Sequence, residues 1–295
     1  MIAYRLFKYG LRFFVYSNLF IAFCILAYTA KTSLLLYGNN GNIYVNSLAF
    51  SATLLFYCFH RINKHKFLTT GENLEERNNW MGRNKIIYYF LIASALISLV
   101  IELTFMPIKA YLVFVPVGIL GVGYTFPIIP TKSGWKRLRD IYWLKTLWIA
   151  FAFSWLTSFL PVIFNEPLES MLKPTVLFVF CRSFLFLFAI CIPFDIRDMN
   201  FDKNRRVNTL PVIVGAKTAI DISIILLLIF ISLICIQFLY FNLDIKLAIA
   251  LFVSAILTVI SLLFAKTKRP ALFYPLLFDG AMLLQWILVV AFSHY

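Results

Sequence analysis

The sequence predicts an all-α polytopic membrane protein, with nine transmembrane helices in a single membrane domain over residues 1–295. Three observations lead to this prediction. Hydrophobic residues make up 62% of the chain and charged residues only 14%, whereas a soluble surface needs far more charge. The apolar stretches are continuous runs of about 20 residues, long enough to cross a ~30 Å hydrocarbon core as helices. Basic residues, finally, are concentrated in alternate connections between these runs.

Nine apolar runs follow one another along the chain. They cover roughly residues 13–37, 43–60, 86–105, 108–126, 141–164, 173–193, 218–240, 245–265 and 271–293. The segment before the first run carries three basic residues on one helical face, a pattern typical of a helix at the membrane surface: Arg5, Lys8 and Arg12. Three prolines are expected near span ends, where a broken helix is tolerated: Pro107, Pro161 and Pro193.

The distribution of charge predicts the orientation of the chain. The N-terminal segment and every second connection are strongly basic. The intervening connections contain only three basic residues, Lys109, Lys173 and Lys246. Because basic connections stay on the cytoplasmic side, the N-terminus is expected in the cytoplasm and the C-terminus on the far side. The formal net charge of +14 then reflects orientation and contact with anionic membrane lipids, and a nucleic-acid partner is not expected.

Two basic connections, 61–85 and 195–217, are longer than a turn requires and are expected to cap the cytoplasmic end. The second begins with three aspartates, although the chain has only 13 acidic residues against 27 basic ones. Asp195, Asp198 and Asp202 are spaced i, i+3, i+7, which puts them on one face of a helix. Stacked carboxylates repel one another unless a cation lies among them. Carboxylate oxygens are ligands of Mg²⁺, and this ion usually shares its site with the phosphates of a substrate.

The aspartates therefore indicate half of a magnesium–diphosphate site at the mouth of a hydrophobic cavity. Basic side chains in the same stretch would hold phosphate oxygens: Arg197, Lys203, Arg205 and Arg206. The alternative interpretation is a solvated loop next to the membrane, where mixed charges are common.

The residues around these aspartates resemble the second aspartate-rich motif of the UbiA superfamily of intramembrane prenyltransferases. In that family a DxxDxxxD element is followed by a basic stretch and then by T-L-P-V-x-x-G, and residues 195–215 read "DIRDMNFDKNRRVNTLPVIVG". The stretch "GYTFPIIPTKSGWKRLRD" at 123–140 is similar to the family's Tyr-x-x-P…Lys-Arg element. Its matching positions are Tyr124, Pro127, Lys136 and Arg137. Nine spans with a cytoplasmic N-terminus also fit the family.

The first aspartate-rich motif of the family, NDxxDxxxD, is altered in this chain. The equivalent stretch is "FYCFHRINKHK", in which Tyr57, His60 and Lys64 take the acidic positions. The spacing still places them on one helical face, but no carboxylate is left for a first Mg²⁺. Fixed cations are one replacement, among them Arg61, Lys64 and His65. Glu72, Glu75 and Glu76 could instead fold back to supply carboxylates, although an ordinary solvated helix is the favoured interpretation of that segment.

The resemblance implies a UbiA-like bundle around a central cavity, in the membrane of a bacterial or archaeal cell. It implies Mg²⁺-dependent transfer of a prenyl group from an isoprenoid diphosphate to a hydrophobic acceptor. Asp195, Asp198 and Asp202 would be the catalytic and metal-binding residues. The expected substrate-binding residues are Tyr57, His60, Arg61, Lys64, Tyr124, Lys136, Arg137, Arg182, Arg197 and Arg205. The altered first motif keeps two alternatives open, a non-catalytic protein that binds a lipid diphosphate and a terpene cyclase of the same superfamily.

Ionisable residues inside spans are functional candidates, because charge is costly in hydrocarbon. Arg182 lies in the sixth run and is expected to face the cavity, with Asp279 as a candidate partner. A separate structural hydrogen bond for Asp279 is the alternative. Lys31 lies near the outer end of the first run, where its side chain is expected to reach the membrane surface.

Overall fold

The computed structural model describes residues 2–65, 72–131, 134–138, 141, 144–204 and 207–293. Its main helices are α1 (Ile2–Tyr16), α2 (Leu19–Tyr37), α3 (Ile43–His65), α4 (Glu72–Arg83), α5 (Lys85–Thr104), α6 (Tyr111–Thr125), α7 (Leu144–Asn165), α8 (Pro174–Asn204), α9 (Leu210–Val214), α10 (Ala216–Tyr240), α11 (Ile245–Leu262) and α12 (Gly280–Ser293). Short helical turns are η1 (Ile108–Ala110), η3 (Leu168–Leu172) and the π-helical η4 (Pro275–Asp279), and two strands are β1 (Ile129–Thr131) and β2 (Gly134–Lys136).

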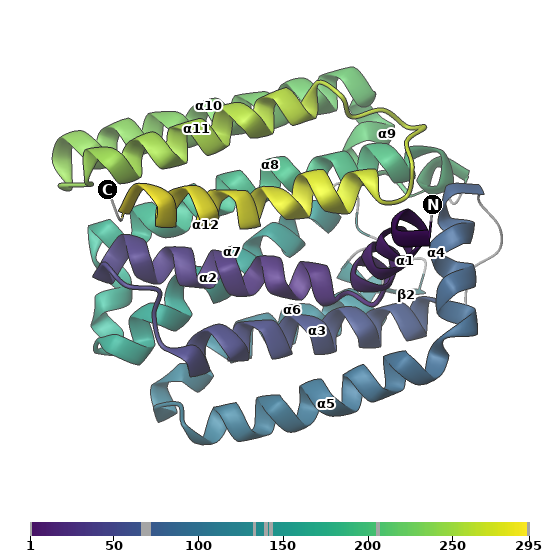
Figure 1. Ribbon diagram of the computed structural model, residues 1–295, viewed down its shortest axis with the longest axis horizontal. Helices are drawn as coiled ribbons and strands as arrows, with labels where there is room; N and C mark the ends of the chain where they lie inside the picture. The colour runs from purple at the N-terminus through teal and green to yellow at the C-terminus, as the bar shows by residue number, and fades with distance from the viewer. Residues whose placement is uncertain are drawn as a thin grey trace.

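Nine helical segments of the described residues are long and apolar enough to cross a membrane, which confirms the predicted number of spans. They run side by side along the longest axis of the molecule (Figure 1). The most buried span is α2, which packs against α3, α7 and α12. The other main contacts join α7 to α8, α8 to α10, α10 to α11, and α11 to α12, while α5 packs on α3 and α6 on α7. The core therefore lies around α2 and α8.

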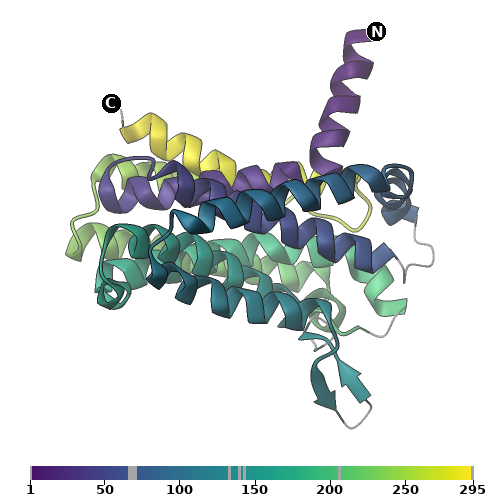
Figure 2. The same ribbon diagram turned by 90° about the horizontal axis from the view of Figure 1, so that it is seen from below.

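The first span is shorter than predicted, because the chain turns before it. Asn18 adopts a left-handed conformation with φ of 68° between α1 and α2, a conformation that Asn tolerates better than most residues. Residues 13–16 consequently belong to α1, and α1 points away from the bundle axis (Figure 2). This direction agrees with the predicted helix at the membrane surface.

Two of the prolines expected near span ends lie inside continuous helices. Pro161 is inside α7 and Pro193 is inside α8. Proline removes one backbone hydrogen bond, but neighbouring helices in a bundle compensate for it. As a result α8 has 31 residues and runs past Pro193 to Asn204, carrying the three aspartates on its last turns.

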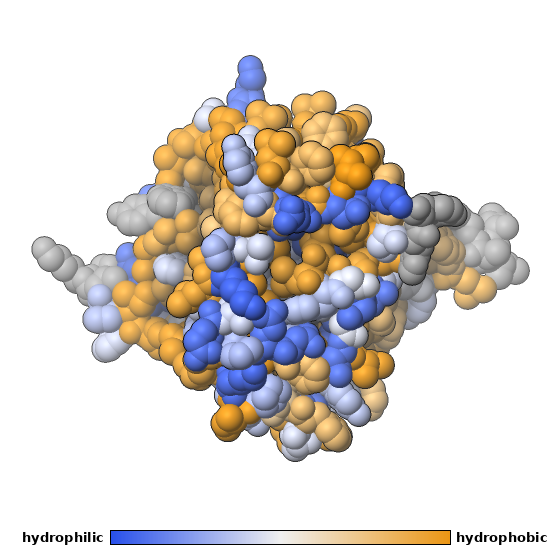
Figure 3. All heavy atoms as spheres, turned by 90° about the vertical axis from the view of Figure 1, so that its left-hand side faces the viewer, coloured by the Kyte–Doolittle hydropathy of each residue, from blue (hydrophilic) through white to orange (hydrophobic). Residues whose placement is uncertain are grey.

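One end of the bundle carries α1, α4, α9 and the β1–β2 hairpin, and we call it the cap end (Figures 1 and 2). The hairpin is antiparallel, pairs Ile129 with Lys136, and projects from this end. The sequence analysis did not predict it. At the opposite end, hydrophilic residues gather over the middle of the face, with hydrophobic residues around them (Figure 3).

The T-L-P-V-x-x-G tail of the second motif forms the corner that leads from the cap end into α10. Thr209 precedes the short helix α9, Pro211 lies in its first turn, and Gly215 ends it with φ of 85° and ψ of 159°. Residues with a Cβ atom almost never adopt this backbone conformation. The last position of the motif therefore requires glycine for a conformational reason.

We predict that Gly215→Ala destabilises the protein by about 1–3 kcal/mol, the usual cost of a non-glycine residue in such a region. Thermal unfolding in detergent would measure the loss. Gly10→Ala is the matched control, because Gly10 lies inside α1 with open space around its Cα and alanine favours helix. Equal stability of both variants would contradict the explanation.

Candidate functional site

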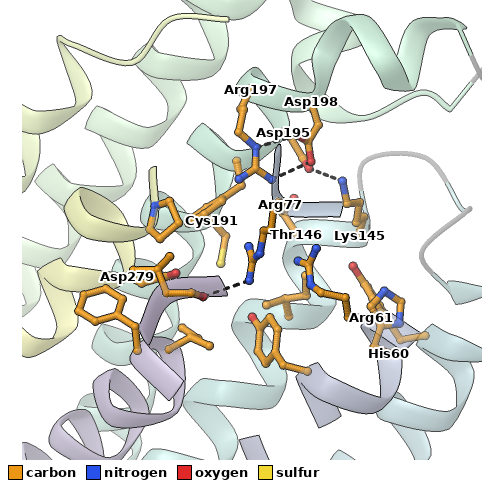
Figure 4. A pocket seen from close by; sticks show the side chains of 18 residues that line it. His60, Arg61, Arg77, Lys145, Thr146, Cys191, Asp195, Arg197, Asp198 and Asp279 are labelled. Carbon is orange, nitrogen blue, oxygen red and sulfur yellow. Dashed lines mark hydrogen bonds and ion pairs between the residues drawn. The ribbon is translucent and has the colours of Figure 1, made fainter. Parts of the chain in front are cut away.

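A cavity of about 160 Å³ lies at the cap end, where α2, α3, α4, α7, α8 and the start of the last span meet (Figure 4). Its charged lining consists of four basic and three acidic side chains: Arg61, Arg77, Lys145, Arg197, Asp195, Asp198 and Asp279. His60, Tyr57 and Tyr124 complete the polar and aromatic wall. The altered first motif and the retained second motif are far apart in sequence, but both line this cavity.

Lys145 on α7 neutralises two of the motif aspartates on α8. Its Nζ lies 2.7 Å from Asp195 Oδ1 and 3.6 Å from Asp202 Oδ2. The side chain of Asp195 is only 2% exposed and that of Lys145 14% exposed, so both charges are largely removed from water. Such a pair is maintained only when the geometry is good, since desolvation opposes the attraction. Lys145 here supplies part of the positive charge that the stacked carboxylates require.

Asp198, the central aspartate, is held by its neighbour. Arg197 donates from Nε to Asp198 Oδ1 at 2.7 Å and from Nη2 to Asp198 Oδ2 at 3.0 Å. The guanidinium also lies 5.3 Å from the ring centre of Phe194 and 5.7 Å from that of Tyr274. Aromatic faces and a two-point hydrogen bond therefore fix the orientation of Arg197 at the cavity wall.

Arg61 and Arg77 supply further positive charge to the cavity, and the carboxylate of Asp279 approaches the guanidinium of Arg77 (Figure 4). Both guanidinium groups lie within the cavity (Figure 4). The Nε atom of each is buried without a hydrogen-bond partner among the described residues. Burial, and then the nearby Arg61, lower the pKa of Arg77 to about 9. An anion in the cavity would relieve this crowding of like charges.

The turn at Asn18 positions Arg77. Arg77 Nη2 donates to Asn18 Oδ1 at 2.7 Å and to the backbone carbonyl of Val15 at 3.4 Å. The left-handed turn between α1 and α2 thereby brings α4 against the cavity. Asp279, at the end of η4, lies within electrostatic range of both Arg77 and Arg197.

The altered first motif lies on the opposite wall, on α3. Tyr57 and His60 both line the cavity. His60 stacks on Phe56 with ring centres 6.0 Å apart, and its Nδ1 lies 3.5 Å from Thr125 Oγ1. The side chain of Lys64 lies outside the described residues. Where the family pattern has carboxylates, this wall presents an aromatic ring and an imidazole.

A second cavity, about 610 Å³ in volume, adjoins the first and is almost entirely apolar. It is lined by residues of α3, α5, α6 and α7, including Phe56, Phe153 and Trp148. Tyr124 and Ile149 line both cavities. A basic compartment and an apolar compartment are therefore neighbours that meet at these two side chains.

Several predicted site residues lie away from the cavity. Lys136 and Arg137 lie on and after β2 of the hairpin, and neither lines the cavity. Arg205 lies outside the described residues. Arg182 is thirteen residues before Asp195 on α8, a distance of ~20 Å along the helix. It donates to Gln237 Oε1 at 2.6 Å and does not line the cavity.

Two expectations for residues within the spans were wrong. Asp279 lines the cap-end cavity and is not the partner of Arg182, which instead pairs with Gln237. Lys31 does not reach the membrane surface. It is 1% exposed and donates to Gln285 Oε1 at 3.1 Å inside the bundle. The position of a lysine along a span does not reveal whether it faces lipid or the core.

The sequence analysis overlooked Arg77 and Lys145 as site residues. Lys145 gave a signal, because it is an ionisable residue in the first turn of an apolar span. Arg77 gave none, since it lies in a polar helix whose charges suggest only a solvated surface.

The donors of the second motif suit a magnesium ion that arrives with a ligand. Asp195 Oδ2 is buried and has no hydrogen-bond partner among the described residues, which leaves one carboxylate oxygen available. Within the described part of the chain, no group of three His, Cys, Asp or Glu side chains is arranged to enclose a metal ion. Mg²⁺ often takes only one or two carboxylates, however, and completes its shell with water and substrate phosphates.

The protein is thus a helical membrane bundle with a basic cavity at one end and an apolar cavity beside it. The sequence profile of the UbiA prenyltransferase family matches residues 83–291. The chain belongs to this family, and with nine apolar spans among its described residues it is an integral membrane protein. The matched range begins after the altered first motif. A comparison with curated protein sequences gives no match.

Solved structures with the same fold cover nearly the whole chain. A UbiA homologue from Archaeoglobus fulgidus bound to GPP and Mg²⁺ has 15% identity and a TM-score of 0.61, over 96% of this chain and 100% of its own. An apo UbiA homologue from Aeropyrum pernix K1 has 14% identity and a TM-score of 0.58, over 93% and 94%. A structure described for digeranylgeranylglyceryl phosphate synthase has 16% identity and a TM-score of 0.57, over 96% and 98%. The predicted fold and family are thereby confirmed.

We predict that Lys145→Met destabilises the protein by about 3–5 kcal/mol, because it leaves Asp195 buried without a counter-charge. Unfolding in detergent by heat or denaturant would measure the loss. The double variant Lys145→Met with Asp195→Asn removes that buried charge and should recover part of the stability. Lys217→Met, at an exposed position of α10, serves as the control. A single variant as stable as this control would contradict the role of the ion pair.

Proposed function

We propose that the protein transfers a prenyl group from an isoprenoid diphosphate to a hydrophobic acceptor in the membrane. One observation carries this proposal: the basic cavity adjoins the apolar cavity, and Tyr124 and Ile149 line both. A prenyl diphosphate has the matching chemistry, with a multiply charged head and an apolar tail. The Archaeoglobus fulgidus homologue described as bound to GPP and Mg²⁺ supports the same class of substrate.

The guanidinium groups of Arg61 and Arg77 would bind the diphosphate. Their unpartnered Nε donors lie in the cavity wall, and a charge-assisted hydrogen bond to phosphate is stronger than a neutral one. Lys145 and Arg197 pair with aspartates, and Asp279 lies near Arg77, so the four basic side chains exceed the three acidic ones in the cavity by one charge. Arg61 and Arg77 would stabilise the negative charge that develops on the leaving diphosphate.

Asp195, Asp198 and Asp202 would hold one Mg²⁺, with the remaining ligands supplied by diphosphate and water. When bound, the ion supplies Lewis-acid stabilisation of the leaving group. The first motif has no carboxylate for a second ion, so Arg61 and Arg77 would provide fixed positive charge in that part of the site. His60 would add a hydrogen bond from the same wall.

The aromatic wall would stabilise the allylic cation that forms when the carbon–oxygen bond breaks. Tyr57 and Tyr124 line the basic cavity, and Tyr57 stacks on Phe153 with ring centres 6.0 Å apart. Aromatic faces attract cations, more strongly where water is excluded. The acceptor would then form a bond to the allylic carbon and release a proton. The basic connections support a cytoplasmic N-terminus, with the cap end on the cytoplasmic side. We infer a bacterial or archaeal cell membrane from the family resemblance alone.

Release of diphosphate tests the proposed function. The purified protein in detergent would receive Mg²⁺, a series of prenyl diphosphates, and native membrane lipids as the source of acceptor. We expect release that requires Mg²⁺ and falls at least 100-fold in Asp198→Asn, the range expected when a group that stabilises transition-state charge is lost. Asp221→Asn, at an exposed position of α10, should keep full activity.

The products distinguish the alternatives. Prenylated lipid supports a transferase, whereas a cyclic hydrocarbon or alcohol formed without acceptor identifies a terpene cyclase. Tight binding of prenyl diphosphate with no release under any of these conditions would identify a non-catalytic binding protein.

The apolar cavity predicts a preference for chain length. Ala152 on α7 lines it, and Ala152→Phe would fill part of its volume. We expect the variant to bind geranylgeranyl diphosphate at least 10-fold more weakly, because each lost buried methylene costs about 0.8 kcal/mol and the long chain loses several. Its affinity for the short dimethylallyl diphosphate should not change. Isothermal titration with both ligands would measure this difference, and an equal loss for both would contradict the assignment of the cavity.

A further inference from the structure

Two basic side chains lie deep inside the bundle, away from the cap-end cavity. Lys31 on α2 and Arg182 on α8 are each 1% exposed. Arg182 is ~20 Å along α8 from Asp195, so this second cluster is separate from the proposed active site. The helices around it are α2 and α12, which pack together, and α8 and α10, which pack together (Figure 1).

The polar neighbours of these cations are neutral. Lys31 Nζ donates to Gln285 Oε1 at 3.1 Å and lies 3.4 Å from the ring centre of Tyr28. Gln285 is oriented in turn by donating to Ser254 Oγ at 3.0 Å. Arg182 Nη1 donates to Gln237 Oε1 at 2.6 Å. Among the described residues, no carboxylate forms an ion pair with either Lys31 or Arg182.

Several hydrogen-bond donors in this cluster also have no partner. Arg182 Nη2, the Tyr28 hydroxyl and the Ser183 hydroxyl are buried without one in the described part of the chain. They belong together in space, because Lys31 lies over the Tyr28 ring, and Tyr28 stacks with ring centres 6.0 Å apart on Phe186, one turn along α8 from Arg182 and Ser183. A buried charge without a counter-charge is costly, and so is a buried donor without an acceptor. A single anion would answer both, since it supplies negative charge and accepts hydrogen bonds.

We propose that Lys31, Arg182, Tyr28 and Ser183 bind a small monovalent anion of the size of chloride inside the bundle. Such an ion accepts hydrogen bonds from all four side chains and reduces the repulsion between the two cations. It links α2 to α8 at a depth where the hydrocarbon offers neither water nor counter-ions. The site has a structural role and stands independently of the proposed prenyl transfer.

Anion-dependent thermal stability tests this proposal. The purified protein in detergent would be titrated with sodium chloride against sodium gluconate at constant ionic strength. A saturable rise of the unfolding midpoint in chloride, on the order of 5 °C, is expected for a ligand that binds only the folded state. Arg182→Gln and Lys31→Met should each abolish the difference between the two salts. Lys246→Gln, at an exposed position of α11, should retain it.

Bromide provides an independent measurement, because its anomalous scattering locates it in a crystal. We expect a bromide peak in contact with Arg182 Nη2 and Lys31 Nζ, in crystals of the full-length protein grown or soaked in sodium bromide. Equal unfolding midpoints in chloride and gluconate for the unaltered protein would overturn the proposal, even if both variants fail to fold. A chloride response that persists in Arg182→Gln would overturn it as well.

Discussion

The ion pair between Lys145 and Asp195 is the interaction on which the cap end depends. It joins α7 to α8 just where α8 presents its aspartates, and it neutralises carboxylates that would otherwise repel one another and any anionic ligand. Arg197 does the same for Asp198, and with four basic side chains against three acidic ones the cavity keeps a net positive charge. A stretch of sequence that is notable for its acids thus forms part of a basic site.

The altered first motif changes the kind of charge that the site contains. A metal ion is exchangeable, and it can enter and leave together with a diphosphate. Guanidinium groups on α3 and α4 are covalently fixed, and Asn18 holds one of them in place. A site built in this way has part of its positive charge oriented before any ligand arrives, at the cost of burying that charge in the free protein.

The sequence predicted the spans and the shared face of the three aspartates, because these follow from periodicity and local spacing, and it predicted the family through the resemblance of two motifs. It did not predict Arg77, whose place in the cavity depends on the left-handed turn at Asn18, a tertiary contact across 59 residues of sequence. Nor did it predict that Arg182 lies away from the cap-end cavity. Hydropathy gives the depth of a residue in a span but not the direction of its side chain, and the same limitation hid the buried position of Lys31. The hairpin is only three residues to a strand, too short to produce a recognisable alternation.

The length of α8 sets the depth at which the proposed transfer would take place. Thirty-one residues extend for ~46 Å, whereas the hydrocarbon core is only ~30 Å thick. For an α8 that begins at one edge of the hydrocarbon core, the last ten residues, which include all three aspartates, would lie beyond the acyl chains at the level of the lipid headgroups. A charged head would remain in this polar layer while its tail lies among apolar side chains below. Any acceptor would have to present its reactive atom at that boundary, so amphiphilic acceptors with a polar reactive end would be favoured over wholly buried ones.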